Sequence, residues 1–183
     1  MRERIIIATL NEVNLHGLKF TMSDLAKRLK ISKRSLYEQF ASKEDLIDAT
    51  LSSVLSHLDK QEETILQSEL PIIDKLSAFI NIVPKETEAF GNHIYEDLKT
   101  AYPQAWEKVD IARKIRMERI TTILEAGIAQ KIIHKVNIPI LQEMIKVSLE
   151  AFTKYEFLNK NNTSYKNAVA EMTNILINGL KYK

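Results

Sequence analysis

The 183-residue sequence predicts an all-α fold, and three observations carry the prediction. Apolar side chains recur at spacings of three and four along most of the chain, which is the period of an amphipathic helix. Each of the four prolines stands before such a stretch, as a residue at the first helical position does. Glycine is scarce, with four residues in all, and no low-complexity run interrupts the pattern. About nine helices are expected.

Composition excludes several classes of protein. The chain is 45% apolar and 27% charged, which is ordinary for a globular domain and argues against disorder. It has no cysteine, so disulfides, thiolate metal sites and cysteine nucleophiles are excluded. The longest apolar run covers residues 5–8, far short of the roughly 20 residues of a membrane span, and no signal peptide is visible. A cytoplasmic protein without a membrane partner is expected.

The first predicted helix ends at Gly17, where its apolar repeat stops. Thr21 or Ser23 caps a short second helix, and Ser32 caps a third that runs to about Phe40. Residues 42–45 resemble a capping box and begin a long amphipathic fourth helix.

The rest of the chain is predicted to form helices at 71–82, 85–99, 103–130, 139–159 and 163–181. Gly127 is placed to bend the third of these or to end it early. Residues 132–136 are β-branched or polar and are expected in a loop or short turn.

The last two predicted helices are apolar on more than one face, so more than one face must be covered. A second copy of the chain is the favoured cover, in a two-fold four-helix interface. The alternative is that these helices are central in a monomeric bundle. The candidate dimer residues are Leu149, Phe152, Met172, Leu176 and Leu180.

Charge is concentrated at the N-terminus. Residues 1–43 hold nine Lys or Arg against four acids, a surplus of five, so the remaining residues carry a net −3 of the total of +2. A basic module on a mildly acidic body indicates that the module meets a polyanion.

Residues 21–43 predict what that module is. Two short helices joined by a tight turn, the second with polar and basic side chains outward, form a helix-turn-helix whose second helix enters the major groove of DNA. There Lys, Arg, Ser and Gln read base edges, while Tyr binds phosphate.

The same segment resembles the DNA-binding domain of the tetracycline-repressor (TetR/AcrR) family. The matching residues are Ser23-Asp24-Leu25-Ala26, Ile31-Ser32, Ser35-Leu36-Tyr37, Phe40 and Ser42-Lys43-Glu44-Asp45-Leu46. The resemblance covers roughly residues 5–55. It implies a DNA-binding domain at 1–45 with three helices, and a helical ligand-binding and dimerisation domain at 46–183.

By this resemblance the protein is a homodimeric, ligand-responsive regulator, a repressor, that binds a palindromic operator and is released by a small-molecule effector. The residues it places on DNA are Ser23, Lys33, Arg34, Ser35, Tyr37, Gln39 and Lys43. Tyr37 and Lys43 are assigned to the phosphate backbone and the others to bases or nearby phosphates. The alternative function is a dimeric architectural or interaction protein with the same DNA-binding module and no effector.

Two residues depart from the family pattern. Lys30 stands where the family usually has glycine, so a left-handed conformation there costs about 1 kcal/mol, or the turn is built differently. Glu38 is an acid on the DNA-reading helix, so it must point away from phosphate or accept a hydrogen bond from a cytosine amino group.

The effector, if there is one, is expected in the body. The candidate lining residues are Phe90, His93, Trp106, Met117, Phe152 and Tyr155. The sequence shows no cluster of charged residues that would be buried in the body, which favours an apolar effector. The four histidines show neither zinc nor di-iron ligand spacing, and no Walker or Gly-x-Ser-x-Gly motif occurs. No cofactor, metal site or enzyme activity is therefore expected.

Overall fold

The computed structural model describes residues 1–83, 93–152 and 154–181, except for the side chains of His93, Glu96 and Tyr155. Within those residues the chain is all-α, as predicted, with one isolated bridge between Ile133 and Lys181. The elements are α1 (Arg2–His16), the 3₁₀ turn η1 (Gly17–Lys19), α2 (Met22–Leu29), α3 (Lys33–Tyr37), α4 (Lys43–Gln67), α5 (Ile72–Ile80), α6 (His93–Ala101), α7 (Pro103–Ala129), α8 (Ile138–Phe152), α9 (Tyr155–Lys160) and α10 (Tyr165–Leu180). No helix among them is long and apolar enough to cross a membrane.

The chain folds into two compact units. The N-terminal unit contains residues 1–57 with 84–110, and the body unit contains 58–83 with 111–183. Helices α4 and α7 each begin in the N-terminal unit and end in the body unit. The division at residue 45 expected from the family resemblance remains a prediction.

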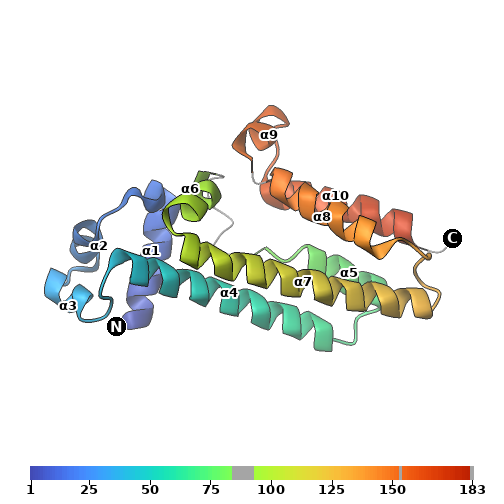
Figure 1. The fold of residues 1–183 in the computed structure, drawn as a ribbon, viewed down its shortest axis with the longest axis horizontal. Helices are drawn as coiled ribbons and strands as arrows, with labels where there is room; N and C mark the ends of the chain where they lie inside the picture. The colour runs from blue at the N-terminus through green and yellow to red at the C-terminus, as the bar shows by residue number, and fades with distance from the viewer. Residues whose placement is uncertain (84–92, 153, 182–183) are drawn as a thin grey trace. The chain divides into compact units, whose positions relative to one another are not determined.

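The N-terminal unit is built on α1, α2, α3 and the start of α4, which gather around one core (Figure 1). Its fully buried side chains include Ile5, Leu25, Leu36 and Leu46, one from each of these helices. The described part of α6 adds Ile94 and Leu98 to the same core. The apolar faces of the four helices therefore cover one another.

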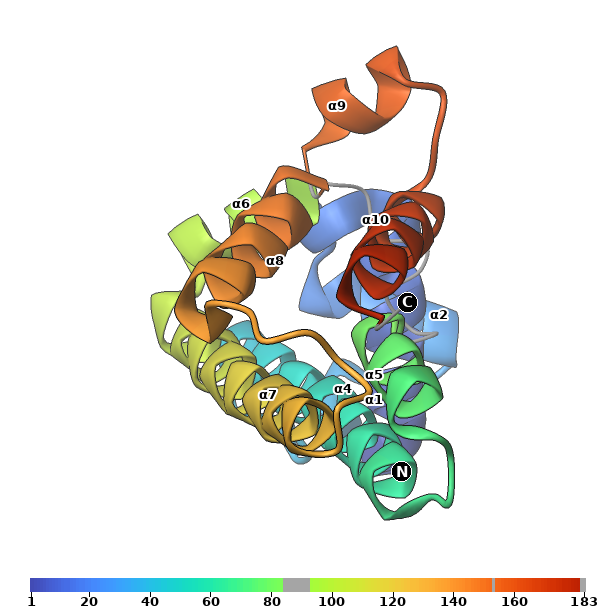
Figure 2. The same ribbon diagram turned by 90° about the vertical axis from the view of Figure 1, so that its right-hand side faces the viewer.

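The body unit packs α5, α7, α8 and α10 around a second core that includes Phe79, Leu124, Ile145 and Val169. Figure 2 shows α8 and α10 side by side, with α5 next to α10. The single predicted helix over 139–159 is wrong. It is divided into α8 and α9, with Lys154 in an extended conformation between them, and α9 stands at one end of α8.

Gly127 does not end α7, because the helix continues to Ala129. A Cβ atom on Gly127 would lie 2.5 Å from Cδ1 of Ile133, which is 1% exposed. The residues after α7 form the predicted loop, which returns across this glycine. The His134 N–H then donates to the Leu180 carbonyl at 2.9 Å, which fastens the loop to the end of α10.

Candidate DNA-binding interface

Thr21, rather than Ser23, caps α2. Its hydroxyl accepts from the Asp24 N–H at 3.2 Å, and the Asp24 carboxylate accepts from the Thr21 N–H at 3.1 Å, which completes a capping box. The hydrogen bonds from the Thr21 hydroxyl and backbone lower the pKa of Asp24. Two orphan N–H groups at the start of the helix are satisfied in this way.

The turn between α2 and α3 is left-handed at Lys30, with φ 56° and ψ 42°. The Lys30 N–H donates to the Lys27 carbonyl at 3.1 Å, and the Ile31 N–H donates to the Ala26 carbonyl at 3.0 Å. These bonds end α2 in the way that a glycine commonly does. Of the two alternatives for Lys30, the structure takes the left-handed one, at a cost of about 1 kcal/mol.

Ser32 caps α3, as predicted, because its Oγ accepts from the Ser35 N–H at 3.0 Å. The two serine hydroxyls also lie 2.8 Å apart. The regular helix ends at Tyr37, three residues before the predicted end, and the Phe40 N–H still reaches the Leu36 carbonyl at 3.0 Å.

α3 has two chemically distinct faces. Leu36 and the following Phe40 are at most 1% exposed and hold the helix on the core. Lys33, Arg34 and Tyr37 are exposed, and Tyr37 retains 49% of its surface, so its ring does not serve the core. Three other predicted contacts are half-buried: Ser23 on α2, Ser35 on α3 and Gln39 just after α3.

Two arginines of α1, which the sequence analysis did not single out, hold α1 to the helix-turn-helix by hydrogen bonds to its backbone carbonyls. Arg2 Nη1 donates to the Gln39 carbonyl at 2.9 Å, and its guanidinium lies 4.2 Å from the Phe40 ring centre. Arg4 Nη2 donates to the Leu29 carbonyl at 3.1 Å. Both cations lie at the C-terminal end of a helix, where the partial charge is negative.

Lys43 points at the protein's own backbone in this structure. Its Nζ donates to the Leu18 carbonyl at 2.5 Å and lies 4.5 Å from the Phe20 ring centre. Burial lowers the pKa of Lys43, and the nearby Glu44 opposes that effect. The phosphate contact assigned to Lys43 remains a prediction, and that contact requires its ammonium to leave Leu18 or to serve both partners.

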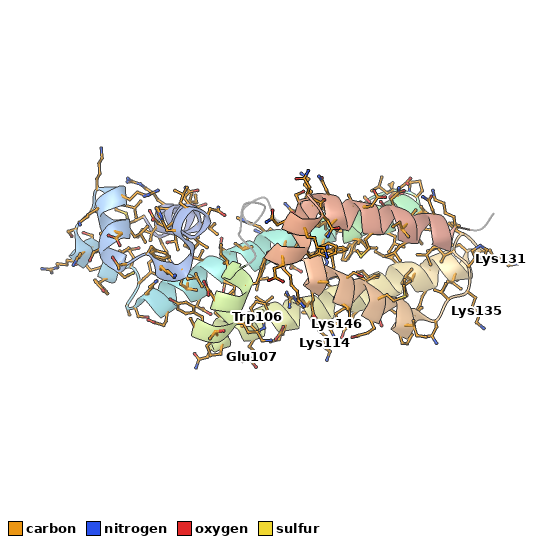
Figure 3. The ribbon with its side chains drawn as sticks, turned by 90° about the horizontal axis from the view of Figure 1, so that it is seen from above. Trp106, Glu107, Lys114, Lys131, Lys135 and Lys146 are labelled. Carbon is orange, nitrogen blue, oxygen red and sulfur yellow. The ribbon has the colours of Figure 1, made fainter. Side chains whose placement is uncertain are left out.

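The candidate effector residues are not gathered around one site. Trp106 lies at the start of α7 and packs against the core of the N-terminal unit (Figure 3). Met117 and Phe152 pack against the core of the body unit. Phe90 and the side chains of His93 and Tyr155 lie outside the described residues.

The body unit contains a cluster of buried charges. The expectation from the sequence that it has no such cluster is therefore wrong. Glu62 of α4 is 3% exposed and is bound by Arg116 at 2.8 Å and by Arg119 at 2.6 Å. Arg119 also binds Asp59 at 2.7 Å. Burial lowers the pKa of Arg116, and Glu62 opposes that shift. The spacing of Arg116 and Arg119 by one helical turn was the available signal.

α8 and α10 leave apolar side chains uncovered on this chain. Ile140, Met144, Val147 and Ile175 are each more than half exposed. A groove of about 440 Å³ lies beside them, and its lining includes Phe152, Phe157, Met172 and Leu176. Of the other candidate dimer residues, Leu149 is half-buried and Leu180 is in the core.

Residues 5–50 match the family model described as "Bacterial regulatory proteins, tetR family". A relative, the uncharacterised helix-turn-helix-type transcriptional regulator YvaF of Bacillus subtilis (strain 168), is 25% identical over 181 residues, which cover 98% of this chain and 95% of the relative.

The fold is shared with solved structures of other transcriptional regulators, two of which were determined with a bound ligand. A putative transcriptional regulator of Saccharomonospora viridis, in complex with choline, matches with a TM-score of 0.84 at 13% identity, over 100% of this chain and 98% of its own. The regulator FadR of Bacillus subtilis, in complex with stearoyl-CoA, matches with a TM-score of 0.69 at 16% identity, over 98% of this chain and 99% of its own.

A capped helix-turn-helix with an exposed second helix, joined to a helical body, defines a DNA-binding transcriptional regulator. Its N-terminal segment, residues 5–50, matches the TetR family of these regulators.

Proposed function

We propose that the protein is a homodimeric repressor that binds a palindromic DNA operator and leaves it when a small-molecule effector binds. The observation that carries the proposal is the division of α3 into a buried apolar face and an exposed face with Lys33, Arg34 and Tyr37. A regulator of this kind acts where its operator lies, so we place it in the cytoplasm.

α3 is the helix that we assign to the major groove. Lys33, Arg34 and Gln39 are proposed to reach base edges, with Ser23 and Ser35 at bases or nearby phosphates and Tyr37 on the phosphate backbone. Five helical residues span only about 7.5 Å at 1.5 Å each, which is enough for about two base pairs. One copy cannot select a site in a genome, so a second copy is required.

The second copy is proposed to cover α8 and α10. Met144, Val147 and Ile175 each leave more than half of their surface in water, and the adjacent groove continues the same apolar face. A two-fold interface would bury this face against itself, so that each side chain is covered by the same face of the partner. Because Leu180 already lies in the core, it is expected to support the interface without touching the partner.

The effector is proposed to act through α4. This helix runs unbroken from Lys43, beside the DNA-binding helices, to Gln67 in the body unit. Two recognition helices must lie about 34–36 Å apart on DNA, so a small tilt of α4 in each subunit misplaces both. The effector need only favour the misplaced form, typically by about 1–3 kcal/mol.

The alternative is a dimeric architectural or interaction protein without an effector. The structural relatives do not identify a ligand, because one was solved with choline and another with stearoyl-CoA. Native mass spectrometry of the purified protein separates the two functions. A bound small molecule whose addition releases DNA supports the repressor, and DNA affinity unchanged by every ligand that stabilises the protein supports the alternative.

Randomised-site selection tests the DNA-binding part. The full-length protein is incubated with duplexes that carry a random central region, and the bound fraction is sequenced. Inverted repeats are expected, because a two-fold dimer reads the same half-site twice. Failure to enrich any inverted repeat would overturn the repressor proposal, whatever the effector.

A further inference from the structure

We propose that Glu38 determines the base specificity of Arg34 by holding its guanidinium end-on toward a guanine. The inference rests on the proposed reading of DNA by α3. It assigns to Glu38 a positioning role instead of a base contact of its own.

The geometry is an ion pair on the exposed face of α3. Arg34 Nε lies 3.0 Å from Glu38 Oε1, one helical turn later in the chain. The Arg34 side chain is 89% exposed and that of Glu38 is 58% exposed, so the pair stands on the surface that would enter the groove. Among the described residues, Glu38 is the only side chain found to bind Arg34, and it binds through Nε.

This contact selects one of two ways in which arginine can bind guanine. A guanidinium can present Nε with one terminal nitrogen, or both terminal nitrogens together. The carboxylate of Glu38 occupies Nε, which leaves Nη1 and Nη2 as the available fork. That fork matches O6 and N7 of guanine, the commonest specific contact in the major groove. A side chain held in advance loses less conformational entropy when the base contact forms.

The charge of Glu38 has a second consequence. A carboxylate on the DNA-facing helix repels phosphate at every sequence alike, so it weakens non-specific binding. On the cognate base pair this cost is offset by the oriented contact of Arg34. Glu38 is therefore expected to lower affinity in general and raise discrimination, a combination that a simple base contact does not produce.

The test compares Arg34→Ala, Glu38→Ala and the double variant in randomised-site selection, with direct binding to a random duplex. Glu38→Ala should weaken the preference at the base pair that Arg34→Ala relaxes, by about three- to fivefold, as expected for an exposed ion pair. The double variant should select no less sharply than Arg34→Ala alone. Binding of Glu38→Ala to the random duplex should become tighter.

Three results would overturn the positioning role. The first is a change at a different base pair that adds to the effect of Arg34→Ala, which would make Glu38 a reader of cytosine. The second is an unchanged preference at every base pair while Arg34→Ala loses one. The third is weaker binding of Glu38→Ala to random DNA. A parent protein that enriches no site at all would instead overturn the proposed function.

Two control variants separate charge from geometry. Glu38→Gln keeps an acceptor oxygen without the charge, so it should retain more of the preference than Glu38→Ala while also binding random DNA more tightly. A Gln variant less selective than the Ala variant would contradict the positioning role. Glu63→Ala removes the same charge from an exposed position of α4 in the body unit, and it should change neither quantity.

Discussion

Arg116 and Glu62 form a buried ion pair that joins α7 to α4, with Arg116 Nη1 2.8 Å from Glu62 Oε1. Arg116 Nη2 also donates to the carbonyl of Phe79 at 2.8 Å, near the end of α5. One guanidinium therefore connects three helices of the body unit. Because Glu62 lies on α4, a movement of that helix, through which the effector is proposed to act, would strain this ion pair.

Removal of Glu62 should strongly destabilise the body. Glu62→Ala leaves Arg116 and Arg119 without their shared carboxylate, and breaking one side of a buried pair typically costs about 3–5 kcal/mol. Urea denaturation measures this loss as a drop in the free energy of unfolding. The neighbouring Glu63 is exposed, so Glu63→Ala should stay within about 0.5 kcal/mol of the parent. Equal effects of the two variants would show that the buried pair contributes little.

Two glycines of the body unit should respond to alanine in opposite directions. A methyl group at Gly127 would collide with buried Ile133, which typically costs about 1–3 kcal/mol for overpacking. Gly179 in α10 has open space at its Cβ position, so alanine there should stabilise the helix by about 0.5–1 kcal/mol. Thermal unfolding of both variants checks the signs. A stable Gly127→Ala variant would mean that the loop at Ile133 moves away at little cost.

The sequence analysis predicted those features that depend on local chemistry. The cap at Ser32 and the helix stop at Gly17 follow from the residues themselves. The left-handed turn at Lys30 was one of two alternatives, and the pattern of residues around it gave no means of choosing between them. The break after Phe152 was missed because no proline or glycine marks it and the apolar repeat continues into α9.

Features that depend on tertiary contacts were not predicted. Glu62 reads as one more charge on an amphipathic helix, and only the approach of α7 makes it a buried partner. Lys43 has the composition of a phosphate contact, whereas its ammonium lies on the Leu18 carbonyl, 25 residues earlier. Long basic side chains reach several partners, so sequence spacing alone does not select one.

The strain at Lys30 predicts a stabilising substitution. Lys30→Gly and Lys30→Ala both remove the charged side chain, but only glycine adopts a φ of 56° without steric cost. The glycine variant should be more stable than the alanine variant by about 1 kcal/mol. Chemical denaturation of the two variants measures the difference, and comparison with each other cancels the loss of charge. Indistinguishable variants would mean that the turn relaxes to another conformation.

The apolar face of α8 and α10 predicts a substitution that yields monomers. Ile175 is 65% exposed on this chain, so Ile175→Glu should leave the fold intact and place a charge in the proposed two-fold interface. Ile7 on α1 is 55% exposed and provides a matched control, Ile7→Glu. Analytical ultracentrifugation should show dimers for the parent and control and monomers for Ile175→Glu. A monomeric parent at micromolar concentration would contradict the dimer, and a dimeric Ile175→Glu would place its interface elsewhere.

Lys43 allows the structural and DNA-binding roles of one side chain to be separated. Lys43→Ala removes the hydrogen bond to Leu18, and a bond from a charged donor typically contributes about 1.5–3 kcal/mol, less here because the side chain is only half-buried. If Lys43 also binds phosphate on DNA, the variant should lower the slope of log affinity against log salt by about 0.9 for each subunit. Tyr37→Phe provides the comparison, because it removes an uncharged contact and should weaken binding with little change in slope. The two measurements are denaturation in urea and binding titrations between low and moderate salt. Reduced stability with an unchanged slope would assign Lys43 to the fold alone, and a reduced slope would show that its ammonium also binds phosphate, either by leaving Leu18 or by serving both partners.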